Sequence, residues 1–415
     1  MLRDIILVQK RELGNRLQES YFERKLSVSL DPEDDRIKVI TGPRRAGKSF
    51  YAVHLISKTG SFGYVNFDDE RLTITGDYDE IISAVNTVYN NPRYLLFDEI
   101  QNLPRWEMFV NRLQRQDFRL LITGSNANLL SSELATHLTG RHANYVLFPF
   151  SFGEYLSTLN NQRTEIEKRE ALETYAEQGG YPEPLLKKID RRDYLRTLLH
   201  STLYKDIVKR FRIRSVQGIE DLTLYLMSNL ARECSFNVLS RVTRCRSVHT
   251  VDRYVHHLLE AYLFFLIPRF SFKVKDQTGR NKKVYCTDNG LAVSAGFSFS
   301  EDRGALYENL VAIALKKEEI AGRISLFSWK SSQNEEVDFV VKEGLHISQL
   351  IQVCTDISHP KTLKREMRAL IKASQELHCD DLLLLNDTVD RMETFKWQDA
   401  ERPIRLMPLW QWLEK

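Results

Sequence analysis

The sequence predicts an α/β protein of several domains, and three of its features support this. The chain has 415 residues, which is more than one typical domain needs. Before about residue 150, short apolar runs alternate with helical patterns, as in a parallel sheet covered by helices on both faces. After that point the pattern changes from a helical region to a basic one and then to a second α/β region. We therefore expect four domains, at residues 1–150, 151–215, 216–300 and 301–415.

The composition is that of a folded globular protein. Hydrophobic residues make up 42% and charged residues 28%, which is unlike a disordered or disulfide-rich chain. No apolar run approaches the ~18 residues of a membrane span, and Met1–Asp4 lacks the basic-then-apolar order of a secretory signal. The five cysteines are widely spaced without a C-x-x-C pair, so neither a disulfide framework nor a zinc site is indicated. We expect a cytoplasmic protein with no membrane partner.

The first domain begins with a lead-in helix between Ile5 and Leu26, followed by a turn-prone acidic loop at Asp31–Asp35. Five short apolar runs then read as strands. They are Ile37–Thr41, Gly63–Phe67, Tyr94–Phe97, Leu120–Thr123 and Tyr145–Phe148.

A phosphate-binding loop follows the first of these strands. Its eight residues fit G-x-x-x-x-G-K-[ST] and are Gly42, Pro43, Arg44, Arg45, Ala46, Gly47, Lys48 and Ser49. The two glycines let the backbone N–H groups point at phosphate oxygens, Lys48 reaches the β- and γ-phosphates, and the Ser49 hydroxyl binds Mg²⁺. The alternative is a chance glycine-rich turn from strand to helix. ATP with Mg²⁺ is the expected ligand.

Adjacent carboxylates close the strand that begins at Tyr94. At the carboxyl end of a strand next to the first, Asp98 can hold the magnesium through water, and Glu99 can polarise the water that attacks the γ-phosphate. The alternative is that the pair only caps the following helix.

A third strand ends in small polar residues at Gly124, Ser125 and Asn126. An amide between the two outer sites could hold the lytic water and sense the γ-phosphate. We favour Asn126 over Ser125 because an amide offers both a donor and an acceptor. An ordinary turn remains the alternative.

Together these residues resemble the AAA+ superfamily, and specifically an archaeal and bacterial family that joins an AAA+ core to a helical lid, a winged helix and a restriction-endonuclease-like domain. The segments that carry the resemblance are Gly42–Ser49, Leu95–Gln101, Ile122–Asn126, Leu138–Arg141, Phe148–Glu154, Gln178–Glu183 and Lys282–Asp288. The resemblance implies Walker A, Walker B and sensor-1 roles for the first three. It also makes Arg141 a candidate arginine finger, which implies a homo-oligomeric ring of six subunits. A surface arginine paired with a carboxylate is the alternative for Arg141.

The middle of the chain is basic. Residues 201–300 carry 16 basic and 8 acidic side chains, a footprint expected of a module that binds a polyanion such as DNA. Three helical segments precede two short strands at Phe270–Lys275 and Lys282–Cys286, which is the shape of a winged helix. On the second of two closely spaced helices, we expect His249, Arg253 and His257 to face away from the core.

The candidate DNA contacts of this region are basic side chains near the helices and in the expected wing. They are Arg241, Arg244, Arg246, Arg253, Lys273, Lys275, Arg280, Lys282 and Lys283. The alternative is a winged helix that serves as a structural spacer or binds a protein partner.

The last domain resembles the restriction-endonuclease-like fold in its spacing. Glu308 lies on an expected helix over Gly304–Lys317, Asp338 precedes a strand, and Gln352 lies near the end of the next strand. In active nucleases of this fold a lysine stands two residues after the last of these positions, and here that residue is Cys354. A thiol cannot supply the fixed cation, so we expect a vestigial site without ordinary nuclease activity. Weak Mg²⁺ binding, or a surface used for assembly, remains open.

Three functions follow. The first is a Mg²⁺-dependent ATPase whose nucleotide cycle drives a DNA-binding or partner-binding module. The second is a nucleotide-gated signalling switch with slow turnover. The third is an ATP-dependent nuclease that acts on branched DNA.

Overall fold

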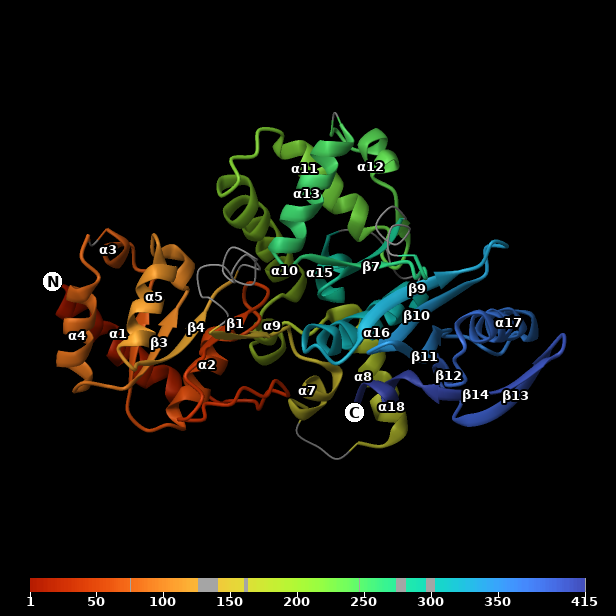
Figure 1. Cartoon of the computed structure of the whole chain (residues 1–415), viewed down its shortest axis with the longest axis horizontal. Helices are drawn as coiled ribbons and strands as arrows, with labels where there is room; N and C mark the ends of the chain where they lie inside the picture. Colours follow the sequence, from red (N-terminus) through yellow and green to blue (C-terminus); the bar gives the residue numbers. More distant parts are fainter. Residues whose placement is uncertain are drawn as a thin grey trace. The chain divides into compact units, whose positions relative to one another are not determined.

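The structure is a computed structural model that describes residues 1–74, 76–125, 141–159, 163–245, 247–273, 281–295 and 303–414. The chain forms two compact units. Unit 1 comprises residues 1–149 together with residues 260–262, and unit 2 comprises residues 150–259 and 263–415 (Figure 1).

Unit 1 is built on a parallel sheet of five strands in the order β2-β3-β4-β1-β5. The strands are β1 (Ile37–Thr41), β2 (Phe62–Asn66), β3 (Tyr94–Asp98), β4 (Arg119–Thr123) and β5 (His142–Val146). The last of them begins three residues before the strand that the sequence predicts at Tyr145. The order corrects one prediction: β4 lies between β1 and β3, so the strand that carries Asp98 is not the neighbour of the first strand.

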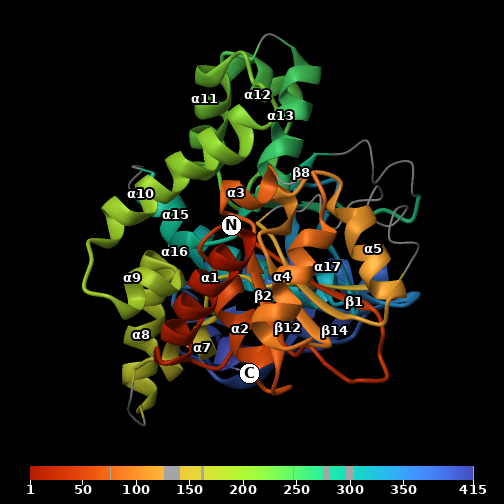
Figure 2. The same cartoon turned by 90° about the vertical axis from the view of Figure 1, so that its left-hand side faces the viewer.

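Helices pack against this sheet, which explains why every residue of β1 is buried (Figure 2). The helices with contacts to its strands are α1 (Leu2–Leu17), α2 (Lys48–Ser57), α4 (Asp79–Tyr89) and α5 (Trp106–Arg115). Unit 1 also contains the short helices α3 (Glu70–Thr73) and η1 (Ile100–Asn102). The lead-in helix α1 ends at Leu17 rather than at Leu26, and the residues that follow it run to β1 without regular structure.

Unit 2 is rich in helices. They are α7 (Phe152–Ser157), α8 (Glu165–Gln178), α9 (Pro182–Leu186), α10 (Arg191–Ser201), the π-helical η3 (Thr202–Lys209), α11 (Val216–Met227), α12 (Phe236–Val242), α13 (Val248–Glu260), α15 (Asn289–Ser294), α16 (Arg303–Ile320), α17 (Pro360–Leu377) and α18 (Leu409–Glu414). Across the part of the chain that the structure describes, no helix has the length and apolarity to cross a bilayer.

Unit 2 also contains a small antiparallel sheet of the order β6-β8-β7, whose strands alternate along the chain with α11, α12 and α13. Its strands are β6 (Glu233–Cys234), β7 (Phe264–Pro268) and β8 (Lys282–Cys286). Lys282–Cys286 is a strand, as predicted. The strand predicted at Phe270–Lys275 is wrong for its described residues, because the partner of β8 is the apolar run that ends at Pro268.

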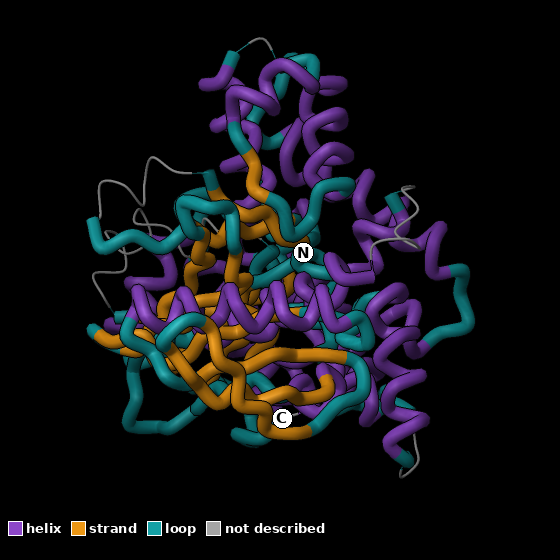
Figure 3. Tube along the Cα trace, turned by 90° about the vertical axis from the view of Figure 1, so that its right-hand side faces the viewer, coloured by secondary structure: helices purple, strands orange, loops and turns teal. Residues whose placement is uncertain are grey.

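A mixed sheet of six strands in the order β13-β14-β12-β11-β10-β9 forms the last part of unit 2. Its strands are β9 (Ser325–Lys330), β10 (Glu336–Glu343), β11 (His346–Val353), β12 (Leu382–Asn386), β13 (Arg391–Trp397) and β14 (Ala400–Pro408). The amphipathic α17 packs against β10, β11 and β12 (Figure 3). Its buried side chains in this core include Met367, Leu370 and Ile371.

Two glycines and a buried aspartate join distant parts of unit 2. The Asp288 carboxylate accepts hydrogen bonds from Gly180 N (2.7 Å) and from Leu291 N (3.2 Å), which caps α15. A Cβ on Gly180 would lie 2.1 Å from Phe150 O, and one on Gly179 would lie 2.1 Å from the Asp288 carboxylate. Positions 179 and 180 therefore require glycine, because the backbone there passes directly over the Phe150 and Asp288 oxygens.

Burial raises the pKa of Asp288 from 3.8 to about 6, against the hydrogen bonds from Gly180, Leu291 and Gly290 that lower it. A carboxyl whose pKa is higher in the folded state favours folding while it is protonated, and this contribution is lost as the pH rises from about 4 through 6. Since one pH unit in that window is worth about 1.4 kcal/mol, the contribution amounts to roughly 3 kcal/mol.

We predict that Asp288→Asn removes this pH dependence. The measurement is the free energy of unfolding from urea titrations at several pH values, taken as the difference between wild type and variant. The control is Asp190→Asn, which alters the exposed cap of α10 and should leave the pH profile as it is. A difference between wild type and Asp288→Asn that stays constant from pH 4 to pH 7 would contradict the prediction.

Candidate functional site

The glycine loop lies between the end of β1 and the beginning of α2, as the motif predicts. Gly42 has a φ of +139°, and a Cβ there would lie 2.2 Å from Leu147 O. Gly47 has a φ of 92° and caps α2 in the left-handed region. Both glycines are thus required by backbone geometry, which turns the loop at its two ends.

Two cations fix the loop from inside. The Lys48 ammonium donates to Pro43 O at 2.9 Å, at the beginning of the same loop. The buried Arg24 guanidinium donates to Ala46 O (3.1 Å) and to Phe148 O (2.6 Å). Sequence reasoning missed Arg24, because nothing in the irregular segment after α1 separates it from a surface arginine.

Asp98 lies at the end of β3 and is only 2% exposed. Its Oδ1 accepts hydrogen bonds from the Ser49 hydroxyl (2.7 Å) and from the Thr123 hydroxyl, and its Oδ2 accepts one from the Tyr64 hydroxyl (3.1 Å). Thr123 is the last residue of β4, the strand that lies between β1 and β3. This strand therefore contributes to the contact between Ser49 and Asp98 instead of preventing it. The structure thereby brings Ser49 and Asp98 together.

Burial, followed by the neighbouring Glu99 carboxylate, raises the pKa of Asp98, while the hydrogen bonds from Thr123 and Ser49 lower it. A hydroxyl and a carboxylate are the hard oxygen ligands that Mg²⁺ prefers. The 2.7 Å contact between Ser49 Oγ and Asp98 Oδ1 shows that both oxygens reach one point. These two residues fit a magnesium ion.

Glu99 directly follows β3 with a left-handed backbone (φ 51°), and its N–H donates to the Thr123 hydroxyl at 3.2 Å. Its Oε2 accepts from Gln101 Nε2 and from the Ser125 hydroxyl (3.3 Å). Ser125, the residue we favoured less, therefore contacts the candidate base. Asn126 lies outside the described residues.

A further carboxylate, Asp68, was missed by the sequence reasoning. It follows β2 at the same edge of the sheet and accepts a hydrogen bond from Asn102 Nδ2 at 2.9 Å. Although Asp68 is exposed, partial desolvation of its carboxylate and then the Glu99 charge raise its pKa, whereas Arg44 and Arg45 of the loop lower it. The signal was available, since Asp68 follows an apolar strand just as Asp98 ends one.

A tyrosine from far along the chain also reaches the site. The Tyr262 hydroxyl donates to Thr41 Oγ1 at 2.7 Å, directly before Gly42. Tyr262 is buried and has a left-handed φ of 55°, a costly backbone for a bulky residue. It belongs to the tripeptide 260–262, which is part of unit 1 although the residues on either side of it belong to unit 2. No local pattern predicts this contact.

Arg141 lies elsewhere. It comes directly before β5, and its carbonyl oxygen accepts from Ile37 N (3.0 Å) at the first residue of β1. The glycine loop leaves the other end of β1, about 16 Å away for five residues of strand. The exposed side chain of Arg141 is therefore remote from the glycine loop of its own chain.

The candidate DNA contacts differ in their exposure to solvent. Exposed side chains are those of Arg241, Arg244, Arg253 and Lys273, and Lys282 is partly exposed. His249 is exposed as expected, whereas His257 is buried and stacked on Phe211 with ring centroids 3.7 Å apart. Arg246, Lys275 and Arg280 lie outside the described residues.

The prediction that Lys283 contacts DNA is wrong. Lys283 is 2% exposed, and its ammonium lies between the carboxylates of Glu308 and Asp338, at 2.9 Å from each. The strand β8 turns this side chain to the interior, and only a partly exposed Lys282 remains on that strand.

The three residues of the predicted vestigial nuclease site do come together. Gln352 Oε1 accepts from Asp338 N at 3.1 Å, and both Asp338 and Glu308 contact Lys283. Cys354 Sγ contacts Asp356 O at 3.5 Å. A lysine from β8 thus provides the positive charge that Cys354 does not.

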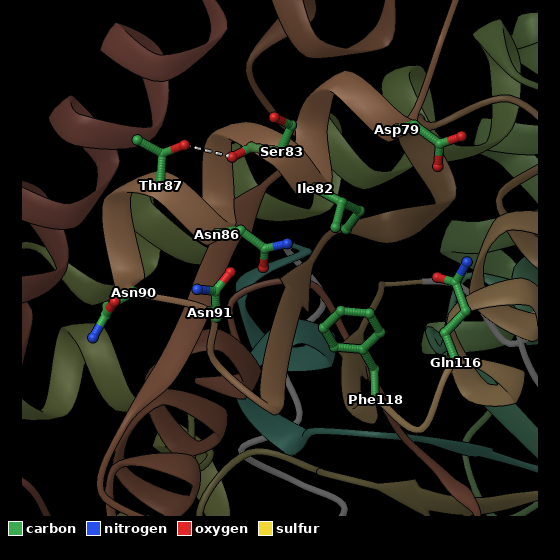
Figure 4. Close-up of a pocket in the computed structure, with 9 residues that line it drawn as sticks. All are labelled: Asp79, Ile82, Ser83, Asn86, Thr87, Asn90, Asn91, Gln116 and Phe118. Carbon is green, nitrogen blue, oxygen red and sulfur yellow. Dashed lines mark hydrogen bonds between the residues drawn. The ribbon is translucent and has the colours of Figure 1, made fainter.

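An open pocket of about 620 Å³ lies at the other edge of the first sheet, where β3 and β4 begin. Figure 4 shows Asn86, Asn91 and Gln116 around it, with the Thr87 hydroxyl bonded to Ser83 O. Because Asn91 precedes β3 at the edge where the strands begin, this pocket is distinct from the glycine loop.

Two family models match the chain. A model described as an AAA domain matches residues 34–156, and a domain of unknown function matches residues 169–302. Among solved structures, the Walker-type ATPase paby2304 of Pyrococcus abyssi is similar at 14% identity and a TM-score of 0.42, covering 69% of this chain and 95% of that one. Cdc6p of Pyrobaculum aerophilum is similar at 13% identity and a TM-score of 0.27, covering 72% and 98%.

Two relatives extend over most of the chain. An uncharacterized protein of Haemophilus influenzae is 28% identical over 364 residues, covering 82% of this chain and 87% of its own. The uncharacterized protein MJ1544 of Methanocaldococcus jannaschii is 33% identical over 408 residues, covering 94% of this chain and 90% of its own. With an AAA domain followed by a domain of unknown function, the chain belongs to the protein family that includes MJ1544.

Proposed function

We propose that the chain is a Mg²⁺-dependent ATPase of the cytoplasm. The observation that carries this proposal is the 2.7 Å hydrogen bond between Ser49 of the glycine loop and Asp98 of β3. It joins the two oxygens that a nucleotide-bound magnesium requires, directly beside the N-terminus of α2.

Each residue then has a defined task. The amides of the loop and the Lys48 ammonium bind the β- and γ-phosphates of ATP. A magnesium ion held by Ser49 and Asp98 would neutralise charge that develops on the phosphate oxygens. Glu99 accepts the proton of the attacking water, and the Ser125 hydroxyl orients the Glu99 carboxylate.

We predict that Glu99→Gln lowers the rate of ATP hydrolysis by about 10²–10⁴-fold and leaves nucleotide affinity almost unchanged, because only the base is removed. Lys48→Ala should abolish binding as well. Steady-state phosphate release and nucleotide titration measure the two effects. Glu80→Gln, an exposed acid on α4, is the matched control. Hydrolysis by Glu99→Gln at the wild-type rate would refute the assignment.

The same assays separate this function from its alternatives. A signalling switch would cleave ATP in a single turnover and then retain ADP, so phosphate release would stop after one equivalent. If Arg141 is the arginine finger of a ring of six subunits, Arg141→Ala should lower ATP hydrolysis by the assembled ring and leave hydrolysis by the monomer unchanged. Arg141 supports that proposal by its distance from the loop of its own chain.

We further propose that Tyr262 transmits the state of the nucleotide site to unit 2. Its hydroxyl contacts the residue that precedes Gly42, and its backbone continues into β7. A displacement of the loop on nucleotide binding would therefore act on a buried group that is covalently continuous with the second unit.

We predict that Tyr262→Phe abolishes most of the nucleotide-dependent change in amide hydrogen exchange of residues 263–273. The reason is that the link between Thr41 and β7 loses its hydrogen bond, at a cost of about 1 kcal/mol in stability. Tyr175→Phe is the control, since it also removes a buried tyrosine hydroxyl. That hydroxyl donates to Phe150 O at 2.6 Å rather than to Thr41. Equal exchange responses in wild type and Tyr262→Phe would disprove the link.

DNA is the partner that we propose for the basic middle. The order α11, β6, α12, α13, β7, β8 is that of a winged helix, and exposed arginines lie on α12 and α13. The ATP cycle would then move or regulate this DNA-binding module. A protein partner at the same surface is the alternative.

We predict that Arg241→Ala and Arg253→Ala each weaken binding to duplex DNA irrespective of sequence and reduce the slope of log affinity against log salt by about 1, as expected when one phosphate contact is lost. Fluorescence anisotropy at several salt concentrations measures this slope. Arg323→Ala, another exposed arginine of unit 2, is the control. Unchanged affinity in both variants would favour the protein partner.

A further inference from the structure

A buried ammonium lies at the centre of an acidic cluster in unit 2. Lys283 Nζ is 2.9 Å from Glu308 Oε1, 2.5 Å from Glu336 Oε1 and 2.9 Å from Asp338 Oδ1. The ammonium donates hydrogen bonds to Glu308 and Asp338 and forms an ion pair with Glu336. The partners come from α16 and β10, so the lysine links its own strand β8 to two other elements.

The lysine stays charged in this environment. Burial by itself would lower the pKa of Lys283, but the carboxylates of Asp338 and Glu308 outweigh it and hold the pKa well above the usual value. Burial and the Asp338 charge in turn raise the pKa of Glu308, whereas Lys283 and the Tyr285 hydroxyl (2.7 Å) lower it. The cluster depends on a cation at its centre.

With the ammonium in place, the described residues include no group of three or more His, Cys, Asp or Glu side chains arranged to hold a metal ion. Carboxylate oxygens are nevertheless the ligands that a hard divalent ion prefers. Two carboxylates on β10 and one on α16 surround the ammonium. Gln352 lies next to them, where its Oε1 accepts from Asp338 N. The cluster is also accessible, since Glu308, Glu336, Asp338 and Gln352 line a cavity of about 530 Å³. Burial alone would therefore not keep an ion out, whereas a fixed positive charge would repel it.

We propose that Lys283 is the built-in cation of this cluster: its ammonium takes the position of a divalent ion, excludes Mg²⁺ and Mn²⁺ from unit 2, and masks a metal site formed by its carboxylate partners. This differs from the loss of a nuclease site by mutation of one lysine. In this fold the carboxylates serve as partners of Lys283. The inference is independent of the ATPase assignment.

The test uses the nucleotide-free full chain with Mn²⁺ as the probe. Free Mn²⁺ is followed by its electron paramagnetic resonance signal, and the unfolding temperature is measured with and without Mn²⁺. Lys283→Met removes the charge and keeps the length of the side chain. We expect it to gain one saturable Mn²⁺ site, at least about tenfold tighter than any in wild type, and to be stabilised by the ion.

Two controls locate the effect. Lys282→Met, on the next residue of β8, should gain no site, and the added substitution Asp338→Asn should remove the gain of Lys283→Met. If Lys283→Met does not fold alone, the proposal requires that millimolar Mn²⁺ restores folding, and failure to do so overturns it. It is also overturned if wild type binds Mn²⁺, or cuts DNA with Mg²⁺, in a manner that Asp338→Asn abolishes.

Discussion

The hydrogen bond between Ser49 and Asp98 is the contact on which the first unit depends. It joins the helix after β1 to the end of β3 across an intervening strand, and Thr123 at the end of that strand completes it. This contact depends on the loop glycines, on the position of β4 and on the burial of Asp98. Glu99 and Asp68 gain their significance from it, because they place further negative charge at the same edge.

Unit 2 handles buried charge by a different arrangement. Its lysine and its carboxylates are already paired within the chain, so the positive charge that the cluster needs comes from a covalently fixed group. A buried pair of this kind does not by itself add stability, because desolvation opposes the attraction between the charges. Removal of one member alone is nevertheless costly, so Lys283 and its carboxylate partners depend on one another.

Local requirements were readable from the sequence, and contacts between distant segments were not. Gly42 and Gly47 could be predicted because the loop geometry admits only glycine, and Asp98 because an apolar strand ends in it. The apolar run before Pro268 fits a helix or a strand equally well by periodicity, so β7 was placed several residues too late. Arg24 and Tyr262 approach the loop from irregular or remote segments that have no motif.

Lys283 was misassigned because a basic residue in a basic region is ordinarily solvated, although alternation along β8 places it on the same face as the buried Tyr285.

The tripeptide that carries Tyr262 has a consequence for the order in which the protein is made. Synthesis completes residues 1–149 long before residue 262 leaves the ribosome, so the sheet can form while its last buried hydroxyl is still missing. The AAA domain is therefore not a module that ends at its family boundary. Its final piece arrives only after more than a hundred residues of the other unit have been translated.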